Sequence, residues 1–168
     1  MRVFVPVTLA ILQRLVTDGS VRAVNDTAFA LTPALREAYA EGDDEELADV
    51  ALREAALASL RLLADGADGG AGAELPLRRA VLEAEADATP RPDLDDAVVR
   101  LAGPVALDDV IAAYVDRAEA EQAVRAAIAV VDDADLGDED AELTVGDAQD
   151  HPLAWYGVQE LPFLIELL

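Results

Sequence analysis

The chain has 168 residues, of which 53% are hydrophobic, so it is long enough to bury a full core within one domain. Its formal net charge is −23 and its 12 basic residues are all arginines, with Arg78-Arg79 as the only adjacent pair. Nucleic acids and anionic membranes are bound by clustered basic residues, so we expect neither as a partner, whereas a basic protein partner or a purely solubilising role fits the charge.

The N-terminal residues predict a strand followed by a helix. Residues 3–7 are apolar and indicate a short buried strand that ends at Pro6, because proline has no N–H to donate to a sheet. Thr8 is typical of a helix N-cap, and Asp18-Gly19 is expected to end that helix. Gln13-Arg14 interrupts the apolar run before any signal-peptide cleavage site, so we expect a cytoplasmic protein.

Two short elements precede the clearest helix. Residues 28–31 predict a strand, and a proline at the first helical position predicts a short helix over 33–40. Capping-box spacing and a broad apolar face predict a helix over 44–64, with Asp49 and Arg53 paired on its surface. The glycine-rich run near 65–74 predicts a flexible loop.

Consecutive strands are expected in the second half. Residues 79–87 alternate between apolar and acidic side chains, which predicts a half-exposed strand with Glu83 on its outer side. Residues 97–101 predict another strand. Residues 109–115 fit a strand or a helix, and we favour the strand because Asp116 and its neighbours then cap a new helix.

That new helix carries an apolar face up to Val131 and an expected pair between Glu121 and Arg125. Residues 132–150 are acidic and contain glycine, which predicts a second flexible loop. Residues 153–156 predict a last strand, and residues 161–168 predict a short apolar helix. An end this apolar docks either on its own sheet or in a subunit interface.

These elements predict one α+β domain over residues 1–168. Because strands follow one another in the second half, we expect a mixed, mainly antiparallel sheet of five to six strands with helices packed on it.

No catalytic constellation is visible. The sequence has no cysteine and no glycine-rich phosphate loop, and Ser20 and Ser59 are its only serines. His151 is the only histidine, either a surface residue or a base that needs an orienting carboxylate. The acidic run departs from the EF-hand pattern, because Gly137 and Asp138 stand where that pattern has an acid and a glycine. We therefore predict no catalytic residue, no metal site and no cofactor.

The candidate contact residues gather near the C-terminus. Aromatic side chains beside polar ones suit a ligand pocket or an interface anchor, and they also suit a corner of the core. The apolar residues after them extend the group as interface candidates. The candidates of this region are His151, Trp155, Tyr156, Glu160, Leu161 and Phe163.

Three segments carry a resemblance to a known family. The opening Arg2-Val3-Phe4-Val5-Pro6, the stretch 27–36, and the closing Leu153-Ala154-Trp155-Tyr156 with Glu160-Leu161 resemble a family of small acidic actinobacterial proteins of unassigned function. The resemblance covers most of the chain. It implies a soluble, cytoplasmic bacterial protein and transfers no catalytic residue.

The layout of the first strand and helix is also similar to small ADP-ribosyltransferase-like domains, which bind NAD in a split sheet. This likeness implies a cleft lined by Thr8, Trp155 and Tyr156, with Arg2 near its mouth. The sequence departs from that family because it has no Ser-Thr-Ser-type strand. If the fold is shared, the chemistry is therefore expected to be lost.

Two functional hypotheses follow. In the first, the chain is a non-enzymatic protein that acts through protein contacts, with a protein partner or a second copy bound at its apolar C-terminal segment. In the second, it is a degenerate nucleotide-binding domain that takes NAD. One continuous sheet favours the first hypothesis, and a split sheet with a cleft favours the second.

Overall fold

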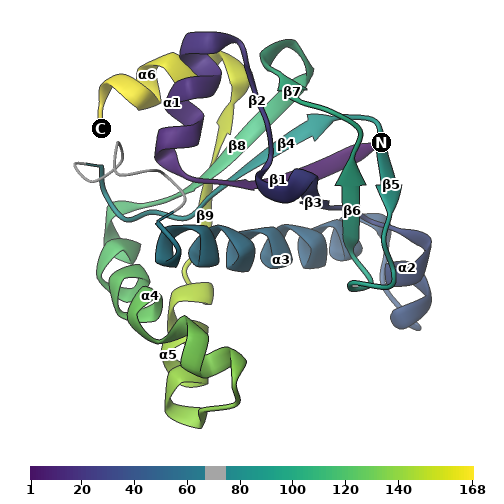
Figure 1. Cartoon of the computed structure of the whole chain (residues 1–168), viewed down its shortest axis with the longest axis vertical. Helices are drawn as coiled ribbons and strands as arrows, with labels where there is room; N and C mark the ends of the chain where they lie inside the picture. Colours follow the sequence, from purple (N-terminus) through teal and green to yellow (C-terminus); the bar gives the residue numbers. More distant parts are fainter. Residues whose placement is uncertain (67–74) are drawn as a thin grey trace.

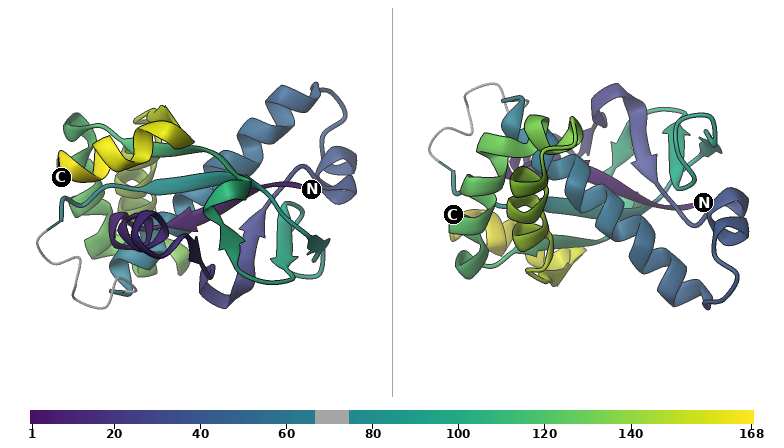
Figure 2. Two further views of the ribbon diagram at one scale, coloured as in Figure 1. Left: turned by 90° about the horizontal axis from the view of Figure 1, so that it is seen from above. Right: turned by 90° about the horizontal axis from the view of Figure 1, so that it is seen from below.

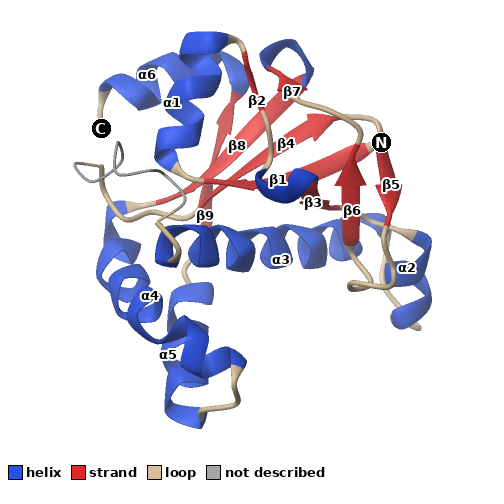
Figure 3. Ribbon diagram, viewed as in Figure 1, coloured by secondary structure: helices blue, strands red, loops and turns tan. Residues whose placement is uncertain are grey.

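Seven strands form one antiparallel sheet in the computed structural model, which describes residues 1–66 and 75–168 (Figures 1 and 3). The order across the sheet is β5-β6-β3-β1-β4-β8-β9. These strands are β1 (Arg2–Val7), β3 (Thr27–Phe29), β4 (Ala80–Glu85), β5 (Ala88–Pro90), β6 (Val98–Leu101), β8 (Val110–Asp116) and β9 (Leu153–Gly157). Two further strands, β2 (Ser20–Val21) and β7 (Val105–Ala106), pair only with each other.

Helices cover both faces of this sheet (Figure 1). They are α1 (Leu9–Asp18), α2 (Pro33–Ala38), α3 (Asp44–Ala64), α4 (Glu121–Asp135), α5 (Glu139–Gln149) and α6 (Leu161–Glu166). Helices α1 and α6 lie on one face, over the larger core cluster. Helix α3 crosses the other face diagonally, as the view from below shows, and α4 and α5 pack beside its C-terminal half (Figure 2).

The predicted fold class is confirmed, with one difference in the strand count. The domain is α+β and its sheet is antiparallel, but seven strands take part where five to six were expected. The extra strand β5 has three residues and includes Pro90, so it is too short to show a period-2 pattern. Among the described helices, none combines the length and the apolar character needed to cross a membrane.

Helix α3 has its predicted bounds because its start is strongly specified. The Asp43 side chain accepts the Glu46 N–H at 2.9 Å, and acidic residues of the first turn face the positive end of the helix dipole. Ser59 is buried, donates to the Val7 carbonyl at 2.7 Å and accepts the Ala80 N–H at 2.9 Å. This serine therefore fastens α3 to the ends of β1 and β4.

Strand β1 does not end at Pro6, contrary to the prediction. Pro6 lies opposite Val81 of β4, and the strand continues to Val7. On its other side β1 pairs with β3 only at Phe4. The ladder on that side has thus ended before Pro6, and proline is tolerated where no neighbour needs its N–H.

Strand β4 is buried on both faces, so the predicted half-exposed strand is wrong. Glu83 is only 2% exposed. Its carboxylate accepts the Arg2 Nε–H at 2.7 Å and the Tyr114 hydroxyl at 3.3 Å. Alternation indicates a wet face only when nothing covers that face, and here helices cover both.

The predicted loop over 132–150 is also wrong. Helix α4 runs on to Asp135, Gly137 turns the chain with φ +96°, and α5 fills most of the remainder. The Asp138 side chain accepts the Ala141 N–H at 2.9 Å, and acids crowd the first turn of α5, where the helix dipole favours them. The acidic composition thus starts a helix in this segment.

Of the remaining local predictions, some are confirmed and one is wrong. Thr8 caps α1, accepting the Ile11 N–H at 3.2 Å, and the strand at 109–115 is confirmed as β8. The last strand and the C-terminal helix are confirmed as β9 and α6. Asp116 is a buried partner of Arg79 and caps no helix. The predicted loop near 65–74 lies outside the described residues beyond Gly66.

Candidate binding groove and sheet edge

Strand β9 is an edge of the seven-stranded sheet. Among residues 1–66 and 75–168 it pairs with β8 alone, with Trp155 opposite Tyr114 and Tyr156 opposite Ala113. Its sequence Leu-Ala-Trp-Tyr-Gly contains no charged residue and no proline, and Trp155 is 56% exposed. Proteins usually protect such edges with charges, prolines or bulges, because unpaired backbone groups are templates for another strand. This edge has none of those devices within its own residues.

A groove lies between α3 and the sheet beside this edge. One cavity of about 350 Å³ is lined by α3, by β8 and by the link from α5 to β9. A second cavity of about 290 Å³ extends it toward Arg2 and Phe4. The two cavities share Asp49, Leu52 and Tyr114 in their walls, so they adjoin each other, and we refer to them together as the groove.

Tyr114 is the aromatic wall shared by both parts of the groove. Its ring lies 6.4 Å from the ring of Phe4, centroid to centroid, at an interplanar angle of 59°. Burial raises the pKa of the Tyr114 hydroxyl above its ordinary value, the negative charges of Glu83 and Asp49 raise it further, and the positive charge of Arg2 opposes them. The phenol therefore stays neutral.

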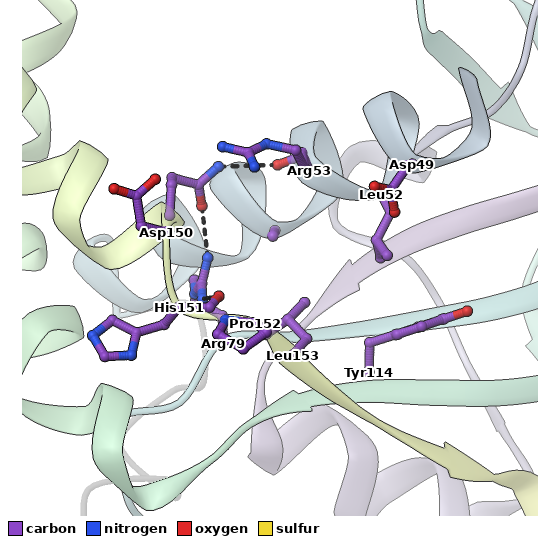
Figure 4. A pocket seen from close by; sticks show the side chains of 11 residues that line it. Asp49, Leu52, Arg53, Arg79, Tyr114, Asp150, His151, Pro152 and Leu153 are labelled. Carbon is purple, nitrogen blue, oxygen red and sulfur yellow. Dashed lines mark hydrogen bonds between the residues drawn. The ribbon is translucent and has the colours of Figure 1, made fainter. Parts of the chain in front are cut away.

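A buried ion pair holds the inner end of the groove together. Arg79 and Asp116 are 1% and 0% exposed, and two guanidinium nitrogens donate to the two carboxylate oxygens at 2.9 and 2.7 Å. Arg79 also donates to the Gln149 amide oxygen at 2.8 Å and to the His151 carbonyl at 2.9 Å (Figure 4). Because its donors are committed to these partners, Arg79 fixes the α5–β9 link to the sheet.

The charges on the groove rim stand apart from one another. Asp49 was expected to pair with Arg53, but among the described residues neither side chain lies within 4.0 Å of an opposite charge. Glu121 likewise pairs with Arg78, at 3.6 Å, and not with Arg125. Figure 4 shows Asp49 and Tyr114 toward one end of the cavity and Asp150 and His151 toward the other.

The predicted site residues do not all meet. His151 lines the groove, and Trp155 lies beside Tyr114 at the sheet edge. Tyr156 points to the opposite face, where it packs against the larger core cluster. Glu160 is exposed just before α6. Within α6, Leu161 is buried in the core whereas Phe163 is 68% exposed.

The cleft expected for NAD is absent from this arrangement. Thr8 is 0% exposed and occupied as the N-cap of α1. Trp155 and Tyr156 follow each other in β9 and therefore point to opposite faces of the sheet. The three residues line no common cavity in the described part of the chain, so the prediction of that cleft is wrong.

Several groove residues were missed by sequence reasoning. Tyr114 and Asp49 lie in separate elements, and only the pairing of β8 and the crossing of α3 bring them together. Arg79 was noted only as part of the single basic pair. A signal was available for Glu83, since an acid inside an otherwise Ala-, Val- and Leu-rich strand in mid-chain indicates a buried partner.

Comparisons with known proteins give a family and nothing finer. No curated protein and no solved structure matches this chain. A family model described as "Family of unknown function (DUF6912)" matches residues 1–165, and the chain therefore belongs to this family.

Proposed function

We propose that this chain acts through protein contacts, and that its edge strand β9 accepts an extended segment of a partner protein. The observation that carries the proposal is the unprotected edge with the exposed Trp155. An added strand pairs its backbone with the edge, and its alternate side chains lie beside those of β9 on each face. Tryptophan is a frequent anchor of such contacts, because it buries a large area at little cost in side-chain entropy.

The occupant we propose is a segment of another protein with basic flanks, and not a second copy. Asp150 precedes β9 and Glu160 follows it, and both are exposed. If two copies joined antiparallel through β9, the Asp150 end of one would meet the Glu160 end of the other, so like charges would face each other at both ends. A segment that is apolar in its middle and basic at its ends avoids this repulsion.

The proposed contact surface differs from the C-terminal segment expected from the sequence. Leu161 belongs to the core, so helix α6 as a whole is not free to act as an interface. The single continuous seven-stranded sheet supports the protein-contact hypothesis over the nucleotide-binding one, for which a split sheet was the expected sign.

The test is a selection from a phage-displayed library of ten-residue peptides against the full chain. We expect selected peptides to slow amide hydrogen exchange in residues 153–157, since an added strand bonds to those backbone groups. Trp155→Glu should weaken these peptides at least tenfold, because it removes the aromatic anchor and places a charge opposite the apolar middle of the segment. Phe163→Glu is the matched control, because Phe163 is also an exposed aromatic but lies on α6.

Two results would overturn the proposal. One is a selection that returns only peptides that bind wild type and Trp155→Glu equally. The other is a set of Trp155-dependent peptides that leave hydrogen exchange in β9 unchanged.

A further inference from the structure

We propose that the groove between α3 and the sheet holds one basic side chain, an arginine or a lysine of the segment bound on β9. Its cationic head lies over the ring of Tyr114 and pairs with Asp49. This inference rests on the proposed function, because it names the side chain that the bound segment sends across the edge.

The charge balance of the groove favours a cation. Two of its arginines are already neutralised, Arg79 by Asp116 and Arg2 by Glu83. Among the described residues, the groove carboxylates without an ion-pair partner are those of Glu45, Asp49 and Asp150, whereas Arg53 is the only groove guanidinium without one. Counting these free groups leaves the groove with a surplus of negative charge.

The position of these charges selects the end where the cation lies. Asp49 is shared by both cavities and lies at the same end of the larger one as Tyr114 (Figure 4). Asp150 and His151 lie at the other end. An anionic ligand near Tyr114 would face Asp49, whose charge raises the pKa of that tyrosine, whereas the buried Glu83 is already paired with Arg2. A cation there is attracted by Asp49, which has no ion-pair partner among the described residues.

The ring of Tyr114 supplies the second part of the site. A guanidinium or ammonium over an aromatic face is attracted by the ring quadrupole. The same arrangement already occurs in the second cavity, where the Arg2 guanidinium carbon lies 5.9 Å from the Phe4 ring centroid. Tyr114 differs from Phe4 in lining both cavities, and so offers its ring to an incoming group.

Geometry limits the side chain to a long one. A strand added outside β9 lies two strand spacings, about 9.6 Å, from β8. A cation is attracted by a ring from within about 6 Å of its centroid, so only a long side chain brings its charge into range of Tyr114. Arginine and lysine have apolar stems that can pack on Leu153 and Leu52, both half-buried in the groove wall, while the charged head reaches Asp49. Short side chains do not reach Tyr114, and acidic side chains are repelled by Asp49.

The experiment uses the same phage-displayed ten-residue peptide library and the full chain. We expect peptides selected on wild type to share an arginine or lysine at one fixed position, and those selected on Asp49→Asn to lose this preference. Replacing that arginine by citrulline (or that lysine by acetyl-lysine) should weaken binding to wild type about tenfold, which corresponds to about 1.4 kcal/mol. In Asp49→Asn the same replacement should cost less than about threefold.

Controls separate this site from the charge of the whole molecule. Asp133→Asn changes the net charge equally, but Asp133 is an exposed residue of α4 outside the groove, so the citrulline replacement should still weaken binding about tenfold in this variant. Tyr114→Leu should reduce the loss of binding that citrulline causes, whereas Tyr114→Phe keeps the ring and should preserve that loss. The inference would be overturned if Tyr114→Leu left the citrulline effect on binding unchanged. It would also be overturned if Asp49→Asn and Asp133→Asn changed that effect equally.

The outcomes also separate the inference from the proposed function. Trp155-dependent peptides without a fixed basic position would refute the cation site and leave strand addition at β9 standing. A failure to obtain any Trp155-dependent peptide would refute both.

Discussion

At the scale of single residues, buried charge decides how this sheet holds together. The Arg79–Asp116 pair lies under the groove, and both side chains are almost completely inaccessible. A buried pair adds little net stability compared with apolar residues, but breaking it leaves an uncompensated charge. The main role of the pair is therefore to fix the position of the α5–β9 link, because Arg79 also donates hydrogen bonds to Gln149 and His151.

Arg79→Met tests this role. The substitution leaves the Asp116 carboxylate buried without its partner, so we expect a loss of about 3–5 kcal/mol in the free energy of unfolding. Arg61→Met is the control, because its pair with Asp135 is partly exposed and should contribute less than about 1 kcal/mol. Urea unfolding followed by far-UV circular dichroism measures both changes. Equal losses in the two variants would show that burial of the pair is unimportant.

Glu83 shows why residue patterns mislead in this sheet. Alternation in β4 places Glu83 on the side opposite to Ala80, Leu82 and Ala84, and the sheet geometry is indeed as the pattern predicts. The error concerns what covers that side. Helix α3 and the Tyr114 ring cover this face of the sheet, and Arg2 supplies the positive charge that pairs with the buried Glu83. A sequence states which side chains share a face, but not which element covers that face.

At the scale of elements, helices and strands with strong local signals were predictable. The capping signals of α1 and α3 and the apolar residues of β8 place these elements within about two residues. Helix α5 was missed because its apolar content is low and its acids resemble those of a disordered segment. Its stability comes from capping by Asp138 and from packing of Ala141 and Ala148, which only the tertiary fold reveals.

Helix α6 gives a test at the same scale, because its two faces differ. Leu161→Asp buries a charge in the core and should cost about 3–5 kcal/mol, which lowers the melting temperature by more than about 8 °C. Phe163→Asp changes an exposed side chain and should alter the free energy of unfolding by less than about 0.5 kcal/mol. Thermal unfolding followed by circular dichroism distinguishes them. A comparable loss in Phe163→Asp would mean that α6 is covered in solution, as in an oligomer.

At the scale of the whole molecule, the sequence singled out some residues of the groove region and missed others. His151 and Trp155 were singled out by residue type, and both lie at or beside the groove. Asp49 and Tyr114 were not, because their significance depends on α3 crossing the sheet beside β8. That arrangement depends on long-range packing, for which a single sequence carries no local signal.

The net charge of −23 also acts at this scale, through contacts between copies. At 0.05 M NaCl we expect a monomer by sedimentation velocity, because the acids at both ends of β9 repel a second copy. At 1 M NaCl the Debye length falls to about 3 Å, so this repulsion is screened and edge pairing between copies should increase. The increase should disappear in Trp155→Glu and persist in Phe163→Glu. A dimer that forms at low salt and depends on Trp155 would show that β9 pairs with a second copy of the chain. The basic flanks proposed for the partner segment would then have no role.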